Sequence, residues 1–123
     1  MNKYSVHIRP YVEIEFEKAN AQLQLGDPAQ AFIHLENAHV LGQTSTYLHV
    51  KAHVRMLKWS IIQKNYGEFL AQTIRIIGAT TKTTIGLVPI GNTGGANVSP
   101  FKSMPLSVDN EKIIALAKKR VNS

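Results

Sequence analysis

Glutamate and histidine residues in the segment 34–53 have spacings typical of metal ligands on helices. His49 and His53 are four residues apart, the spacing at which one helix offers two imidazoles to a single ion. Glu36 and His39 are three residues apart, which is the Glu-x-x-His arrangement of helical carboxylate metal sites. The sequence therefore predicts a metal site shared by two neighbouring helices.

The geometry of two antiparallel helices adds His34 and ranks it below the other histidines. In such a hairpin His39 is level with His49, and His34 is level with His53. His34 and His39 are about 140° apart on their own helix, so His34 is expected as a fourth ligand or as a group behind the ligands. Glu15, on the preceding helix, is the other residue that could complete the site.

The available donors limit the metal without identifying it. The chain has no cysteine, so only nitrogen and oxygen ligands remain, and Zn²⁺, Fe²⁺, Mn²⁺, Ni²⁺ and Cu²⁺ all fit. Three histidines with an open position suit hydrolytic or sensing chemistry, whereas two carboxylates suit iron or manganese. A metal site is favoured over the alternatives because burying an imidazole without a partner destabilises the fold by a few kcal/mol for each unsatisfied group. A structural hydrogen-bond network and metal-free acid–base chemistry remain the alternatives.

Helix start and stop signals predict the elements that carry these residues. Asp27 followed by Pro28 starts one helix and Gly42 ends it, while Thr44 or Ser45 caps the next. The expected fold is all-α, with antiparallel helical hairpins stacked in a tetratricopeptide-like manner, four main helices and a C-terminal helix. Helices are expected at residues 9–25, 28–42, 45–64, 68–80 and 108–121, in a single domain covering 1–123.

A segment rich in Gly, Pro, Asn, Ser and Thr, residues 86–105, interrupts the helical pattern. A loop of this length in a small domain is usually functional or disordered, and its apolar residues predict an ordered loop that packs on the helices. Its centre could form a lid over the histidines or a plain structural clasp; this centre consists of Gly91, Asn92, Thr93, Gly94 and Gly95. Arg75 is expected to bind an anion or to form a salt bridge with Glu15 or Glu36.

Composition limits the class of protein. The 123 residues are 44% hydrophobic, which is sufficient for one core. The net charge of +6 comes from scattered basic residues without interleaved aromatic residues, so nucleic-acid binding is not expected. No signal-like or membrane-spanning run is present, which predicts a cytoplasmic protein with no membrane partner. A tetratricopeptide-like interaction module that binds a protein partner, and a homodimer, are left open.

The chain also resembles an uncharacterised bacterial family, catalogued as domain of unknown function 3703, over nearly its whole length. The family's motif matches the candidate ligands and the Gly-rich loop, but the resemblance implies no activity. Ser103 departs from it, because the family more often has proline there. The resemblance is carried by Arg9-Pro10, Glu15, His34-Leu35-Glu36, Ala38-His39, Leu41-Gly42-Gln43, His49, His53, Met56-Leu57, residues 91–95, Asn97-Val98-Ser99 and Met104-Pro105.

Overall fold

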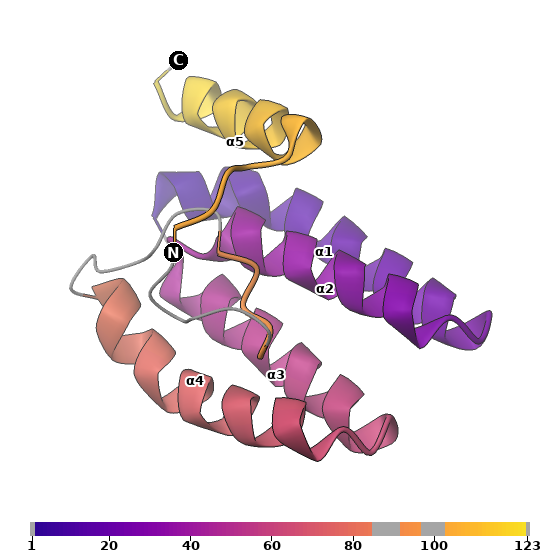
Figure 1. The fold of residues 1–123 in the computed structure, drawn as a ribbon. Coiled ribbons are helices and arrows are strands. Elements are labelled where there is room, and N and C mark those ends of the chain that lie inside the picture. Colours follow the sequence, from indigo (N-terminus) through magenta and orange to yellow (C-terminus); the bar gives the residue numbers. More distant parts are fainter. Residues whose placement is uncertain (1, 85–91, 97–102, 123) are drawn as a thin grey trace.

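The protein is built from five helices that carry the candidate ligands on neighbouring elements (Figure 1). The computed structural model describes residues 2–84, 92–96 and 103–122, and the regular elements in these ranges are all helices. The predicted all-α fold is confirmed, while tetratricopeptide-like stacking stays a prediction. The helices are α1 (Lys3–Gln24), α2 (Pro28–Gly42), α3 (Thr46–Ile62), α4 (Tyr66–Thr84) and α5 (Val108–Val121).

Short polar side chains start three of the helices where the sequence predicts a start. Asp27, Ser45 and Ser107 each accept a hydrogen bond from the backbone N–H three residues further on. Each bond satisfies one of the N–H groups that a helix leaves unpaired in its first turn. The ends of α2 and α5 also lie where the sequence places them.

The first helix begins earlier than the sequence predicts. Pro10 is typical of a first turn, but it lies inside α1, which starts at Lys3. Asn2 provides the cap, because its side-chain oxygen accepts the N–H of Ser5 at 2.8 Å. A cap and two full turns before the proline therefore outweigh the single backbone hydrogen bond that the proline removes.

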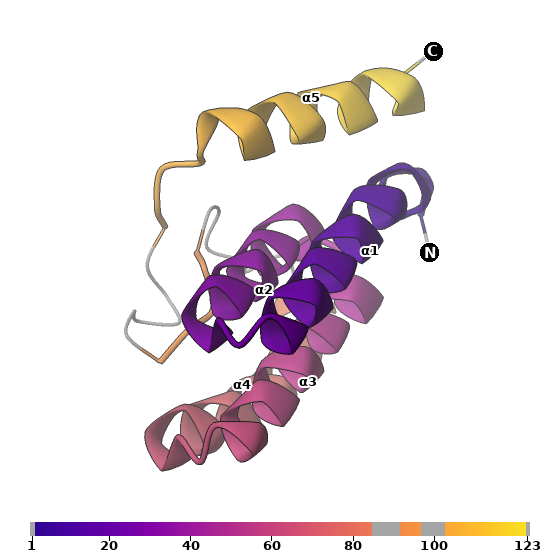
Figure 2. The ribbon, with the colours of Figure 1, turned by 90° about the vertical axis from the view of Figure 1, so that its right-hand side faces the viewer.

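The helices form three tiers, which Figures 1 and 2 show from two sides. The α1–α2 pair is in the middle, α5 lies against α1 and α2 on one side, and the α3–α4 pair lies on the other. Among the described residues, α4 packs against one helix only, α3. In the described ranges, no helix combines the length and the apolar character needed to cross a bilayer.

Apolar side chains at helical spacing form the core between these tiers. Small residues allow close packing there, and Gly42 shows this most clearly, because a Cβ atom at Gly42 would lie 2.8 Å from Cβ of Leu48. The end of α2 can therefore approach the start of α3 only with glycine at this position. The fully buried core comprises Ile8, Val12, Phe16, Ala19, Ala31, Leu35, Ala38, Leu41, Leu48, Ala52, Met56 and Ala117.

Residues 92–96 of the Gly-rich loop are fastened to α4. The Glu68 carboxylate accepts the backbone N–H of Ala96 at 2.8 Å, and Arg75 donates to the carbonyl oxygens of Gly94 and Gly95. Polar side chains of one helix thus hold this piece of loop against the histidine-bearing helices. The rest of the expected lid, including Gly91, lies outside the described residues.

Candidate metal centre

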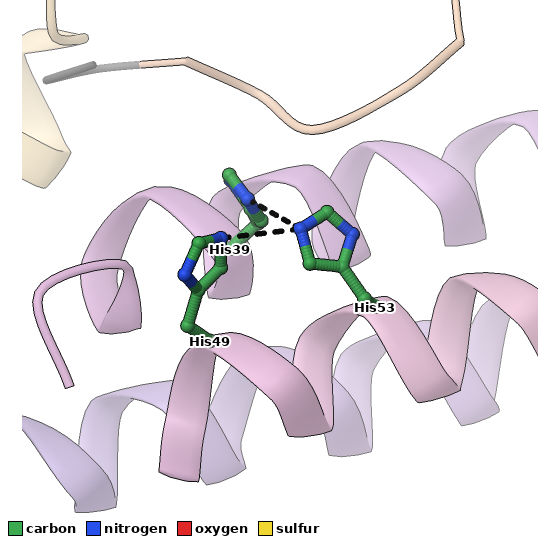
Figure 3. Close-up of side chains that lie close together, drawn as sticks. All are labelled: His39, His49 and His53. Carbon is green, nitrogen blue, oxygen red and sulfur yellow. Dashed lines mark hydrogen bonds between the residues drawn. The ribbon is translucent and has the colours of Figure 1, made fainter. Parts of the chain in front are cut away.

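Three of the predicted ligands meet inside the protein, and Figure 3 shows their rings pointing toward one another. His39 comes from α2, and His49 and His53 come from α3. Nε2 of His53 lies 3.1 Å from Nε2 of His39 and 3.1 Å from Nε2 of His49. All three side chains are buried, and one ligand atom from each lies within 4.8 Å of the others.

The local sequence explains why these rings converge. His49 and His53 are one helical turn apart, so they lie on the same face of α3. The connection from α2 to α3 is only three residues long, from Gln43 to Ser45, which folds α2 back beside α3. His39 near the end of α2 is therefore brought opposite the first turns of α3.

Hydrogen bonds outside the cluster fix which nitrogen His39 and His53 turn inward. Nδ1 of His39 donates to the backbone carbonyl of Asn92 at 2.7 Å, since a carbonyl oxygen can only accept. Nδ1 of His53 donates to Oε1 of Gln72 at 2.6 Å. The amide nitrogen of Gln72 donates to the carbonyl of Gly94 at 2.8 Å, which leaves its oxygen for His53. Metal-binding histidines are usually oriented by partners of this kind.

When His39 and His53 are neutral, these bonds leave no proton for the contact between the two rings. Neutral His39 and neutral His53 each carry their one ring proton on Nδ1, so each Nε2 presents a lone pair. The two Nε2 atoms are 3.1 Å apart, and the lone pairs face each other with no proton between them. A cation placed between the rings would turn this repulsion into attraction, so the arrangement is suited to holding a metal ion.

Electrostatics keep the His39 ring in the form that binds metals. Burial lowers the pKa of His39 well below its ordinary value of 6.5, and the positive charges that His53 and His49 would carry lower this pKa further. The His39 ring is therefore neutral at pH 7, with its Nε2 lone pair available. Metals bind the neutral form of imidazole.

Gly94 closes the cluster from the loop side. Its backbone has φ +84°, a conformation that glycine adopts without steric cost. A Cβ atom at Gly94 would also lie 2.7 Å from Cδ2 and 2.9 Å from Nε2 of His39. Residue 94 must be glycine for both reasons, and its close approach places the loop backbone directly against the His39 ring.

Comparison with known proteins gives a family and no function. The family model described as protein of unknown function (DUF3703) matches residues 6–114. The chain belongs to this family. This match confirms the predicted family membership. It also covers all six ligands that the sequence predicts. No curated protein and no solved structure matches the chain.

In this DUF3703 member, two of the predicted ligands lie in a separate pair. Nδ1 of His34 is 2.6 Å from Oε2 of Glu15, and the two side chains join α2 to α1. The structure does not bring the His34 side chain to His53, which contacts His39 and His49 instead. The 140° between His34 and His39 on α2 is the reason, since the two rings leave the helix in different directions.

Glu36, the remaining predicted ligand, belongs to the surroundings of the three-histidine group. Its carboxylate is half-buried and interacts with the side chain of Thr93. Burial raises the pKa of Glu36, and the nearby negative charge of Glu68 raises it further, whereas the Thr93 hydrogen bond lowers it. The side chain of Glu36 therefore connects α2 to the loop.

Arg75 binds the backbone of the loop, and its expected binding of an anion stays a prediction. Its guanidinium donates to Gly94 and Gly95 as described above, and the negative charge of Glu68 acts on it. Burial lowers the pKa of Arg75, and the Glu68 charge opposes this effect. Arg75 thus fixes the loop that contacts His39.

Sequence reasoning missed Glu68 and Gln72 as parts of this site. Glu68, Gln72 and Arg75 follow one another at intervals of four and three residues, so they form one polar stripe on α4. That stripe, in a helix otherwise rich in Ile, Leu and Thr, was the available signal. Asn92 is expected in the possible lid, but its hydrogen bond to His39 could not be predicted from its side chain, because the backbone carbonyl makes it.

Proposed function

We infer that the protein binds one divalent transition-metal ion between α2 and α3. The ligands are Nε2 of His39, Nε2 of His53 and a ring nitrogen of His49. The observation that supports this function best is the contact at 3.1 Å between two Nε2 atoms whose ring protons are both used on Nδ1. A buried pair of facing lone pairs is unfavourable alone and favourable around a cation.

The donors favour zinc, copper, nickel or iron over manganese. The group consists of three imidazoles and no carboxylate, and manganese prefers oxygen ligands. With a metal–nitrogen distance of about 2.05 Å, nitrogens 3.1 Å apart subtend roughly 98° at the metal. That angle lies between those of octahedral and tetrahedral ions. Three protein ligands leave at least one position for a further group, as in reactive rather than purely structural zinc sites.

Elemental analysis of untagged protein, purified without chelators, tests the proposal. We expect close to one equivalent of metal per chain, and its loss in the double variant His49→Ala, His53→Ala. The chelated protein should regain one equivalent of added Zn²⁺ with a rise in melting temperature, because the ion binds the folded state. Co²⁺ in place of Zn²⁺ should give the visible absorption of nitrogen-ligated Co²⁺, which reports on the ligands directly.

His7 provides the matched control. It is the one histidine outside residues 34–53 and is expected to leave the metal content unchanged when replaced by alanine. Less than a tenth of an equivalent of metal, with no thermal stabilisation by Zn²⁺, Fe²⁺, Mn²⁺, Ni²⁺ or Cu²⁺, would rule the proposal out. In that case the histidines join helices, and the protein is better explained as an interaction module.

A further inference from the structure

The polarity of α4 is reversed relative to that of an ordinary surface helix. Its polar stripe, Glu68, Gln72 and Arg75, faces the loop and the histidines. Its large apolar side chains face outward. Tyr66 is 77% exposed, Leu70 61%, Ile74 62% and Ile77 75%. A surface helix normally hides such residues and exposes its charges.

No charge breaks the outer face of α4 in the part whose side chains are described. The exposed positions from 66 to 77 hold only Tyr, Gly, Phe, Leu, Thr and Ile. The charged residues of this part, Glu68 and Arg75, are turned to the inner side. The chain as a whole carries a net charge of +6, so the absence of charge from this face distinguishes it from the protein as a whole. Contiguous apolar patches of this kind mark interaction sites.

The spacing of the outward residues is self-complementary. Tyr66, Leu70, Ile74 and Ile77 follow one another at intervals of four, four and three, so they form one stripe along the helix. When two copies of α4 lie antiparallel about a twofold axis near residue 72, Tyr66 meets Ile77 of the second copy and Leu70 meets Ile74. One stripe therefore provides both halves of the contact, as a symmetric dimer requires.

The exposed area is close to that of a small stable interface. With Phe69 included, the outward apolar residues of α4 expose roughly 600–700 Å² per copy, and the smallest standard interfaces bury about 600 Å² per partner. Two copies that each carry a charge of +6 repel one another, and an uncharged face is where they can approach most closely. We propose that this apolar face of α4 binds a second copy of the same chain, forming a homodimer with antiparallel α4 helices.

Sedimentation of the full chain, as purified, tests the dimer. We expect twice the monomer mass at micromolar concentrations. In the double variant Leu70→Glu, Ile74→Glu the dissociation constant of the dimer should rise at least about 100-fold, because four carboxylates face one another across the axis. The control Leu25→Glu places a carboxylate at an apolar position that is also exposed, at 77%, but lies at the α1–α2 turn. It should leave the dimer intact.

Crosslinking distinguishes the antiparallel dimer and does not depend on folding of the glutamate variant. The chain has no cysteine, so one introduced cysteine is a unique probe. Thr73→Cys lies near the proposed axis and should crosslink to itself with a short bis-maleimide. Tyr66→Cys should fail to do so, because its two copies would lie roughly 17 Å apart along the helices. A mixture of Tyr66→Cys and Ile77→Cys should crosslink.

Three results would overturn the proposal. They are a wild-type monomer at 100 micromolar, a dimer that Leu25→Glu weakens as much as the double variant does, and self-crosslinking of Tyr66→Cys in place of Thr73→Cys. A monomer would mean that another segment of the chain or a different protein covers the face. None of these results bears on metal content, so the metal proposal stands or falls separately.

Discussion

At the scale of single residues, Gly94 is the most demanding position around the three histidines. Alanine there would meet both a positive φ and the His39 ring at less than 3 Å. We expect Gly94→Ala to lower the free energy of unfolding by roughly 2–4 kcal/mol, the combined cost of the backbone conformation and the overlap. We also expect it to weaken metal binding at least about tenfold, because His39 loses its orientation. Urea denaturation and a metal titration measure the two effects.

Alanine variants of two other glycines separate the cost of the backbone conformation from the cost of the overlap with His39. Gly26 also has a positive φ of +80°, but a Cβ atom there would meet nothing within 4 Å, so Gly26→Ala should cost only about 1 kcal/mol. Gly67 lies in the first turn of α4, where a Cβ atom would make only an ordinary contact, 3.8 Å from Oδ1 of Asn65, so Gly67→Ala should change stability by less than about 1 kcal/mol. Equal costs at residues 94 and 26 would show that the loop does not press on His39.

The residues of the candidate site could be predicted from the sequence only where their spacing along one helix places them on the same face. His49 and His53 are one turn apart, and the sequence alone places them on one face of a helix. Gln72 and Asn92 orient the rings through contacts between segments far apart in the chain, and no local pattern encodes such contacts. His34 shows the reverse error, because antiparallel register predicts the level of a residue but not the direction of its side chain.

At the scale of helices, the pair of His34 and Glu15 is expected to join α1 to α2 without holding the metal. Both side chains are mostly buried and 2.6 Å apart, so removing one leaves the other poorly satisfied. We expect Glu15→Gln and His34→Gln each to lower the free energy of unfolding by roughly 1–2 kcal/mol. The double variant should cost less than the sum of the two, which is the mark of a direct contact.

Metal content decides whether this pair belongs to the site. Both single variants should keep one equivalent of metal, as should Glu17→Gln, which alters an exposed carboxylate on α1 and should change stability by less than about 0.5 kcal/mol. Loss of metal in Glu15→Gln at unchanged helix content would instead place Glu15 among the ligands.

The helices show where start signals suffice and where they mislead. Asp27 with Pro28 correctly predicts a helix start, because a cap acts on the three residues that follow it. Pro10 is misread as a start, because nothing in its own turn reports the cap at Asn2. The outward apolar face of α4 is visible as a periodic pattern, but which side of that pattern faces the core depends on Glu68, Gln72 and Arg75, which bind the loop.

At the scale of the whole molecule, the histidine cluster couples folding to pH. Burial lowers the pKa of His39 below its ordinary value of 6.5. Below pH 6.5, His39 therefore binds a proton in the unfolded chain but stays neutral in the folded chain. The free energy of unfolding of metal-free protein should therefore fall as the pH falls from 7 to 5.5, by up to about 1.4 kcal/mol per pH unit for one proton. Urea denaturation across this range measures the slope.

Glu36 and a histidine variant identify the source of that slope. The raised pKa of Glu36 has the opposite sign, because the folded chain then holds a proton that the unfolded chain has lost, so acid favours folding through this group. Glu36→Gln should leave the fall between pH 7 and 5.5 in place or steepen it, while His39→Gln should flatten it. If His39→Gln keeps the wild-type slope, the proton is taken up elsewhere, and the buried rings do not control the stability of the metal-free protein.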